Sequence, residues 1–324
     1  MRRREFLGAA GAVLAAGASS KAWGQAAASW PDKPVKLILP YAPGGATDLL
    51  GRPWAEVLTK AFGQQFVIEN RGGAGGMIGT EAAAKAPPDG YTFLFTPNAT
   101  LTVLPNMRKT PYDPVKSFAP VARTGDLVTG FVIHPSVGVK TFKELITYAK
   151  ANPGKLVFGS AGLGTATQLR IETLKFRTGI DILHVPYRGS ADALNDLLPG
   201  TIHMMTEINV LPHVKAGKLI LLNISHSSRH PDFPEIPTLT ELGIPNSDVP
   251  IWYSILAPAG TPPEIVDKLN AKIVEIAKSD DMKARMRGIN VEVPIQTPAE
   301  IAAFMVADTV LNAEVIKAAN IKLE

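Results

Sequence analysis

Short apolar segments rich in β-branched residues alternate along the chain with longer segments whose apolar residues recur every three or four positions. The short segments predict β-strands, and the longer ones predict amphipathic helices. The predicted strands span residues 35–39, 65–69, 92–95, 131–134, 155–159, 182–185, 202–205 and 219–225. The predicted helices span residues 49–62, 77–86, 142–151, 167–176 and 191–198. Such alternation is typical of an α/β fold with largely parallel sheets.

Two more helices are predicted near the C-terminus. The first begins at Pro262-Pro263, and four apolar residues share one of its faces: Ile265, Leu269, Ile273 and Ile276. The second begins at Thr297-Pro298-Ala299-Glu300, which supplies an N-cap threonine, a proline at the first helical position and a glutamate at the third. Both helices are expected to pack on the core and to carry no chemistry.

The first 26 residues have the pattern of an export signal. Residues 3–7, Arg-Arg-Glu-Phe-Leu, fit the twin-arginine motif, and an apolar run over residues 8–18 leads to small residues around Gly24. A basic N-terminal helix of the fold is the alternative, but it explains neither the small residues nor the new start at Trp30-Pro31. The apolar run is too short for a permanent membrane anchor. We therefore expect a protein exported to the periplasm through a twin-arginine signal in residues 1–26.

Charge and cysteine content exclude several classes of function. The formal charge is +4, but residues 1–26 hold four of the 33 basic residues and one of the 29 acidic ones. The remainder has 29 basic and 28 acidic residues, a charge of +1, so no partner nucleic acid or anionic membrane is indicated. With no cysteine there are no disulfides, thiolate metal sites or cysteine nucleophiles. A chain of this length favours two lobes.

A similar loop follows a strand in each half of the chain. Strand 35–39 leads into Pro43-Gly44-Gly45-Ala46-Thr47, and strand 155–159 leads into Ser160-Ala161-Gly162-Leu163-Gly164-Thr165, each before a helix. The carboxyl ends of parallel strands are where open α/β folds bind ligands. Glycines allow close backbone approach, and the N–H groups at a helix N-terminus attract an anion. Two facing loops predict an anion site, although glycines that serve only tight turns remain the alternative.

Catalytic motifs are incomplete. The segment from Gly162 begins like a dinucleotide fingerprint, but its third glycine position is Thr167. Ser160 lacks the first glycine of a hydrolase nucleophile elbow. His226 and His230 have metal-binding spacing, yet they lie in a segment that reads as a loop. No cofactor and no metal are predicted. An exported α/β hydrolase that uses Ser160 with a histidine is kept as the alternative function.

Several long blocks resemble the Bug-type, or tripartite tricarboxylate transporter (TctC-like), extracytoplasmic solute receptors. The resemblance runs from about Trp30 to the C-terminus, in matching order and spacing, through these blocks: "ILPYAPGGATDLLGR", "VIENRGGAGGMIGTEAAAKAPPDGYTFLF", "TPYDPVKSFAPVA", "HVPYRGSADALNDLLPGTIHMM", "LPHVKAGKLILL" and "LAPAGTPPEIVDKLN".

The resemblance implies a fold and a function. The fold would be the two-lobed type II periplasmic-binding-protein, or Venus flytrap, architecture with a mixed, mainly parallel sheet in each lobe. The function would be to capture a small carboxylate, whether a di- or tricarboxylate, an aromatic carboxylate or an acidic amino acid. The partners would be membrane permease subunits and, as a further option, a sensor kinase, with the receptor itself a monomer. Family members grip the carboxylate with two glycine-bearing loops and ordered waters.

The family's ligand-binding positions carry over residue by residue. Those of the first loop are Tyr41, Pro43, Gly44, Gly45, Ala46, Thr47 and Asp48, where Asp48 is either a ligand contact or only a helix cap. Those of the second loop are Ser160, Ala161, Gly162, Gly164, Thr165 and Gln168. Further candidates in other blocks are Gly76, Met77, Thr96, Asn98, Tyr187, Arg188 and Glu207. Arg188 either meets a distal carboxylate or is solvated.

This chain departs from the family pattern at four places that bear on ligand choice. Gln168 replaces a usual histidine, and Leu163 and Met77 each replace a frequent asparagine. Thr206-Glu207 replaces the usual Phe-Asp, in a segment that is about two residues shorter. Glu207 either keeps an acidic role, facing a ligand amine or bridging waters, or points elsewhere.

The lobes are predicted to be discontinuous in sequence. The expected ranges are 31–127 with 252–324 for the first lobe, 128–251 for the second, and 123–129 with 247–253 for the hinge.

Overall fold

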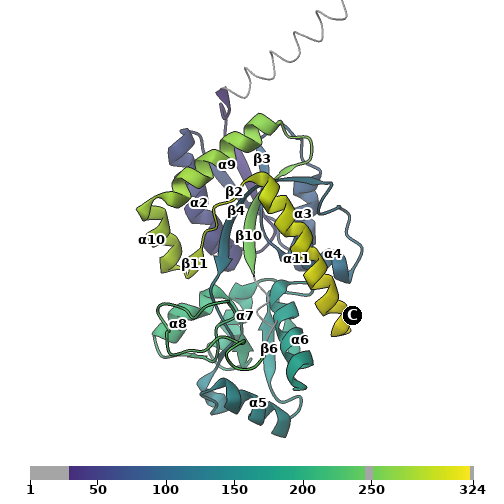
Figure 1. Ribbon diagram of the computed structural model, residues 1–324, viewed down its shortest axis with the longest axis vertical. Helices are drawn as coiled ribbons and strands as arrows, with labels where there is room; N and C mark the ends of the chain where they lie inside the picture. Colours follow the sequence, from purple (N-terminus) through teal and green to yellow (C-terminus); the bar gives the residue numbers. More distant parts are fainter. Residues whose placement is uncertain (1–28, 245–250, 322–324) are drawn as a thin grey trace, which may run out of the picture.

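The computed structural model describes residues 29–244 and 251–321, arranged in two α/β lobes one above the other (Figure 1). The predicted export signal of residues 1–26 lies outside the described residues, as does part of the predicted hinge segment 247–253. None of the described helices combines the length and the apolar character that crossing a membrane requires. Each lobe is built on its own sheet.

The first lobe contains a six-stranded mixed sheet. Its strand order is β11-β4-β10-β3-β1-β2. The strands are β1 (Val35–Leu39), β2 (Phe66–Asn70), β3 (Thr92–Pro97), β4 (Phe118–Leu127), β10 (Trp252–Pro258) and β11 (Val291–Glu292). β1 runs parallel to β2 and β3, whereas β10 runs antiparallel to β3 and β4, and β11 antiparallel to β4.

Successive side chains of β1 point to opposite faces of the sheet, and both faces are apolar. Helices therefore cover both faces. Leu37 and Leu39 pack in the core beneath α2 (Ala46–Phe62) and α9 (Pro263–Lys278). Ile38 packs in the opposite core. That second core is covered by α3 (Met77–Ala84) and α11 (Pro298–Ala318). The remaining helices of this lobe are α4 (Leu104–Met107) and α10 (Asp280–Gly288), with short turns at Ala74–Gly76 and Ala99–Val103.

The second lobe contains a five-stranded mixed sheet of order β7-β6-β8-β5-β9. The strands are β5 (Val132–Ile133), β6 (Val157–Ser160), β7 (Leu183–Pro186), β8 (Met204–Met205) and β9 (Ile220–Leu221). β6 is parallel to β7 and β8, and β5 is antiparallel to β8 and β9. Helices α5 (Phe142–Ala151) and α6 (Ala166–Thr178) cover one core, and α7 (Ser190–Leu197) and α8 (Leu211–Lys215) cover the other.

The two lobes are in direct contact. Ala166 and Leu169 of α6, together with Ile208, belong to the same hydrophobic cluster as the core of the first lobe. Across the junction the Ala46 backbone N–H donates a hydrogen bond to Ser190 Oγ at 3.1 Å. The described arrangement is therefore a closed one, with segments from both lobes packed against each other.

The sequence pattern located most of the strands but missed three in the first lobe. Each of the eight predicted strands overlaps a strand of the structure, and the capping box at Thr297 is confirmed. The missed strands are β4, β10 and β11. β4 contains Pro120, Arg123 and Gly125, so it lacks the alternation of a half-buried strand. β10 is buried along its whole length, so its side chains do not alternate with exposed polar ones.

Candidate functional site

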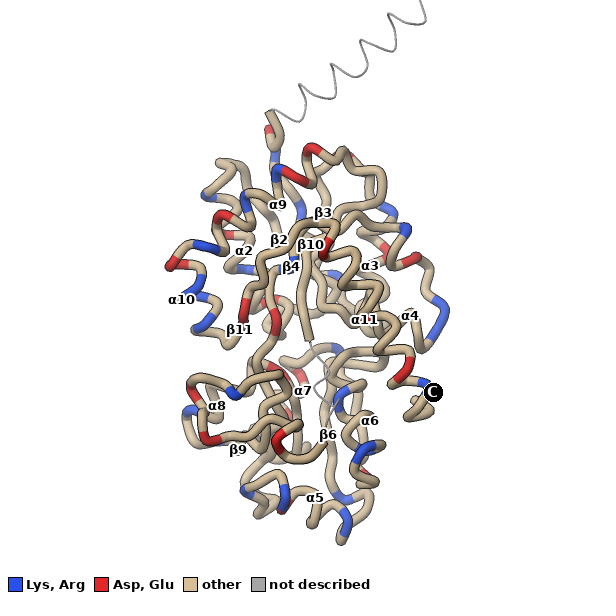
Figure 2. Tube along the Cα trace, in the orientation of Figure 1, with Lys and Arg blue, Asp and Glu red and all other residues tan. Residues whose placement is uncertain are grey.

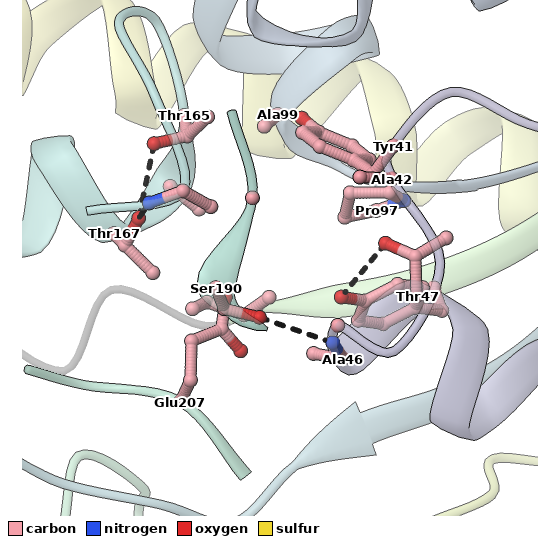
Figure 3. Close-up of a pocket in the computed structure, with 16 residues that line it drawn as sticks. Tyr41, Ala42, Ala46, Thr47, Pro97, Ala99, Thr165, Thr167, Ser190 and Glu207 are labelled. Atoms are coloured by element: carbon pink, nitrogen blue, oxygen red, sulfur yellow. Dashed lines mark hydrogen bonds between the residues drawn. The ribbon is translucent and has the colours of Figure 1, made fainter. Parts of the chain in front are cut away.

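A small cavity lies between the lobes where three helices begin. The N-terminal residues of α2, α6 and α7 line it: Gly45, Ala46, Thr165, Ala166, Gly189 and Ser190 (Figure 3). Its volume of about 20 Å³ is close to that needed for one water molecule. Each helix N-terminus directs N–H groups and a partial positive charge toward its first turn. The cavity is therefore an environment that favours negative charge.

The first loop is braced from behind by Asp48. Its carboxylate accepts hydrogen bonds from the Gly44 N–H at 3.1 Å, from Arg52 Nε at 2.7 Å and from Asn70 Nδ2 at 3.3 Å. Burial would raise the pKa of Asp48, but these hydrogen bonds outweigh it and hold the pKa below the ordinary value. Gly44 has a φ of +79°, a conformation that favours glycine. The Asp48 side chain thus holds the loop and does not line the cavity.

The glycine amides of the second loop already have acceptors within the protein. The Gly162 N–H donates to Ser160 Oγ at 3.1 Å, and the Gly164 N–H donates to Gln168 Oε1 at 2.7 Å. The Ala161 N–H donates to Thr167 Oγ1 at 3.1 Å. In this closed arrangement these three loop amides are therefore not free donors for an anion. The side chains of Ser160 and Gln168 instead fix the loop that precedes α6.

Other donors of the cavity come from first-turn amides and hydroxyl groups. The first-turn N–H groups of α2 and α6 are partly engaged, because that of Ala46 donates to Ser190 Oγ and that of Gln168 donates to Thr165 Oγ1. Thr47, Thr165 and the phenols of Tyr41 and Tyr253 add hydroxyl groups to the wall. Burial raises the pKa of Tyr41 and the pKa of Tyr253. The charge of the nearby Glu207 raises both pKa values further. Both phenols therefore stay protonated and can donate hydrogen bonds.

Glu207 brings a buried carboxyl group to the same cavity. The residue is 5% exposed, and its Oε2 has no hydrogen-bond partner among the described residues. Burial raises the pKa of Glu207 to about 7, although the Arg170 charge and the Ile208 N–H act in the opposite direction. Arg170 is itself buried and donates from Nη1 to Thr206 Oγ1 at 3.0 Å. Near neutral pH the Glu207 side chain is thus poised between its protonated and ionised forms.

A wider cavity of about 280 Å³ adjoins the inner one and shares Tyr41 and Ala161 with it. Its cationic side chains come from both lobes, Arg108 after α4 and Arg188 after β7. Tyr41 lines both spaces, and its hydroxyl donates to the Gly75 carbonyl at 2.9 Å. We call the two spaces the inner cavity and the outer mouth.

Ser160 forms a serine–histidine pair that is not placed for catalysis. Its Oγ lies 2.6 Å from His184 Nε2, and burial lowers the pKa of His184 to about 4. Ser160 is only 1% exposed and lines neither the inner cavity nor the outer mouth. Its hydroxyl also contacts the backbone of Gly162. The pair is a structural link between β6 and β7.

The structure brings together eleven of the sequence-predicted site residues. Those that line the inner cavity are Tyr41, Gly45, Ala46, Thr47, Ala161, Thr165 and Glu207. Those that line the outer mouth, besides Tyr41 and Ala161, are Gly76, Gly162, Tyr187 and Arg188. Those that line neither space are Pro43, Gly44, Asp48, Met77, Thr96, Asn98, Ser160, Gly164 and Gln168.

Asn98 and Thr96 face the core of the first lobe. Asn98 Nδ2 donates to Asp308 Oδ2 at 3.3 Å, and Trp252 Nε1 donates to the same oxygen at 3.0 Å. Thr96 Oγ1 lies 2.8 Å from Thr100 Oγ1. Asn98 follows β3 as predicted, whereas Thr96 lies within β3, and their side chains brace α11 and the turn after β3.

Several lining residues escaped the sequence reasoning, among them Ser190, Tyr253 and Arg108. Ser190 begins α7 and was visible only as the end of the block that contains Arg188. Tyr253 lies on the unpredicted strand β10, and its hydroxyl is 3.5 Å from Thr47 Oγ1. Arg108 lies in a polar segment with no periodic signal. No local motif marks these residues, because only the closure of the lobes brings them to the cavity.

Two α/β lobes that close over a polar cavity at three helix N-termini define a solute-binding receptor of the type II periplasmic-binding-protein class. The family model described as "Tripartite tricarboxylate transporter family receptor" (TctC) matches residues 50–321. The chain belongs to this family, whose members are solute-binding receptors and not enzymes.

Individual relatives agree with this assignment. Protein BugT of Bordetella pertussis is 36% identical over 303 residues, covering 91% of this chain and 92% of BugT. The structure of Rpa4515 of R. palustris with adipate is 33% identical with a TM-score of 0.87, covering 90% of this chain and 99% of that one. The structure of MatC from Rhodopseudomonas palustris with bound malate is 29% identical with a TM-score of 0.84, covering 89% of this chain and all 100% of that one.

Proposed function

We propose that this receptor captures a small carboxylate in the inner cavity and delivers it to the permease of a tripartite tricarboxylate transporter in the periplasm. The observation that carries the proposal is the convergence of the α2, α6 and α7 N-termini on one buried space. Helix N-termini stabilise negative charge through their free N–H groups and dipoles. The adipate and malate in the structures of two relatives support a carboxylate as the ligand.

The position of cationic groups favours a ligand with a second acidic group. Arg108 and Arg188 lie at the outer mouth, on opposite lobes. If one carboxylate of the ligand is held in the inner cavity, the other end of the ligand would be directed toward these two arginines. Arginine recognises carboxylates through paired N–H donors. A short dicarboxylate fits this arrangement better than a monocarboxylate.

Glu207 would take part as a proton donor. A ligand carboxylate in the inner cavity would lie near a buried acid whose pKa is already raised to about 7. A second negative charge raises that pKa further, so the bound state favours protonated Glu207. The protonated Oε2 could then donate to the ligand.

Delivery requires the lobes to open. We propose that they move as bodies about the two crossings at 123–129 and 247–253, with residues 31–127 and 252–324 in one lobe and 128–251 in the other. The segment of residues 1–26 would direct export by the twin-arginine route. The inner cavity is lined by residues of both lobes, and its volume of about 20 Å³ leaves no room for ligand exchange without such opening.

A thermal-shift screen of short mono-, di- and tricarboxylates tests the proposal. A ligand at about 100 times its dissociation constant should stabilise the protein by about 2.7 kcal/mol. The dimethyl ester of the best ligand is the matched uncharged control, and we expect it to bind at least about ten-fold more weakly, a loss of about 1.4 kcal/mol. Equal affinity of acid and ester would refute the anion site, and turnover of the ester would favour a hydrolase.

A further inference from the structure

A second cavity lies between the lobes on the side away from the outer mouth. Its volume is about 480 Å³, within the range of small-molecule sites. The first lobe contributes residues from the end of α9, from α10 and from β11. The second lobe contributes Val128 together with His230 and Pro231, and Val128 and Phe233 belong to one of its core clusters. We call this space the lateral cavity, and it shares no lining residue with the inner cavity or the outer mouth.

The inner wall of the lateral cavity is apolar and firmly held. Val128, Met286 and Val291 line it, and each is buried. Met286 is 1% exposed and belongs to the core of the first lobe. The Val128 N–H donates to the Asn290 carbonyl at 3.0 Å, which joins the end of β4 to the turn before β11. These side chains form a preformed surface for a hydrocarbon group.

The rim of the lateral cavity carries an excess of positive charge. Lys278, Lys283 and Arg287 line it, whereas Glu292 is its one acidic lining residue. Lys283 Nζ lies 3.8 Å from Asp280 Oδ1, an exposed pair, and Glu292 Oε2 lies 4.0 Å from His226 Nε2. Basic residues of α10 are visible at the edge of the molecule in Figure 2. Asp232 also lies near Arg287, whose charge helps to lower the Asp232 pKa, but its carboxylate already pairs with Lys215 at 2.7 Å. The lining itself carries three cations and one carboxylate, so the rim attracts an anion.

From this arrangement we propose that the lateral cavity binds a small amphipathic anion, a carboxylate with an aliphatic body. The aliphatic part would lie on Val128, Met286 and Val291, and the carboxylate would face Lys283 and Arg287. Burial of each methylene contributes to affinity, and the exposed cations select the ionised head group. The site differs from the inner cavity in chemistry, because its anion would meet side-chain cations and its body would meet an apolar wall.

Octanoate is the probe, and titration calorimetry measures its affinity. We expect saturable binding to the wild-type protein and at least ten-fold weaker binding of octanol, which lacks the charge. The double variant Lys283→Glu/Arg287→Glu should weaken octanoate binding at least ten-fold. The matched control is Lys143→Glu/Lys150→Glu on α5, which reverses two exposed lysines outside all three cavities and should change the affinity less than two-fold.

Two further variants separate the lateral cavity from the carboxylate site of the proposed function. Glu207→Gln changes a lining residue of the inner cavity at nearly constant size, which leaves the contact between the lobes intact, and it should leave octanoate binding unchanged. Val293→Trp places an indole in the lateral cavity and should abolish octanoate binding while the inner-site ligand still binds. Loss of octanoate binding in Glu207→Gln, equal effects of the two double variants, or equal affinity for octanol would each overturn the proposal.

Discussion

The Ala46 backbone N–H at the start of α2 donates a 3.1 Å hydrogen bond to Ser190 Oγ at the start of α7. The two residues are 144 positions apart in the sequence and lie in different lobes. This bond joins two of the helix N-termini that surround the inner cavity (Figure 3). It therefore ties the anion-favouring part of the site directly to closure of the lobes.

Removal of this bond should weaken ligand binding without unfolding the protein. In Ser190→Ala the closed state loses one hydrogen bond, worth about 1 kcal/mol, or roughly a five-fold loss of affinity. The unfolding midpoint of the ligand-free protein should change little, because neither lobe core is altered. Calorimetry measures the affinity, and Ser136→Ala on the second lobe's exposed turn is the control. Unchanged affinity in Ser190→Ala would show that the bond does not contribute to the bound state.

Gly164 should be indispensable for closure. Its φ is +74°, and a Cβ at this position would lie 2.3 Å from Leu104 Cδ1 of the first lobe. Gly164→Val should therefore abolish ligand binding while the second lobe stays folded. Gly179→Val is the matched control, because Gly179 has a φ of +67° with nothing within 4 Å of its Cβ position. Both variants place valine at a positive φ, so both carry similar backbone strain. If both lose ligand binding, the strained turn is the cause, and the contact between Gly164 and Leu104 is not.

Glu207 should make stability depend on pH. Its pKa is raised from 4.5 to about 7 in the folded protein, so between these values the folded state binds more protons than the unfolded state. Stability contributed by protonated Glu207 is complete below pH 4.5 and is lost as the pH rises through about 7. The difference corresponds to about 3 kcal/mol as an upper figure. Glu207→Gln should remove this dependence and be more stable than wild type at pH 8.

Denaturant unfolding at pH 5 and pH 8 measures this effect. Glu264→Gln, which alters an exposed glutamate at the start of α9, should retain the wild-type dependence. Carboxylate affinity should also fall as the pH rises above 7 in the wild type and should not do so in Glu207→Gln. The same pH profile in Glu207→Gln and wild type would assign the effect to another group.

Ligand binding should be accompanied by lobe closure about the two crossings. Small-angle scattering should show a smaller radius of gyration with saturating ligand than without it. Gly164→Val should keep the larger value at all ligand concentrations. A wild-type radius that is independent of ligand would mean that the free protein already adopts the closed arrangement.

The sequence alone determined the alternating elements, the helix starts and the two glycine loops. These features depend on local physics: β1 has the predicted bounds, α5 has the predicted bounds, and the Thr297 box caps α11 as expected. The family resemblance placed Tyr41, Thr47, Thr165 and Glu207 among the site residues, and all four line the inner cavity. Local patterns and long matching blocks predict these features because both depend only on residues that are contiguous in the sequence.

The tertiary structure decided which polar groups face the cavity and which serve the scaffold. Gly164 lies in a predicted binding loop, yet its N–H donates to the Gln168 side chain. Asn98, another predicted site residue, donates to Asp308 in the core of the first lobe. Conversely, Tyr253 and Arg108 reach the site from segments without any motif. Hydrogen-bond partners that lie on another element or on the other lobe leave no periodic signal in the sequence. Only the packing of strands such as β10, and the closure of the two lobes, fixes those partners.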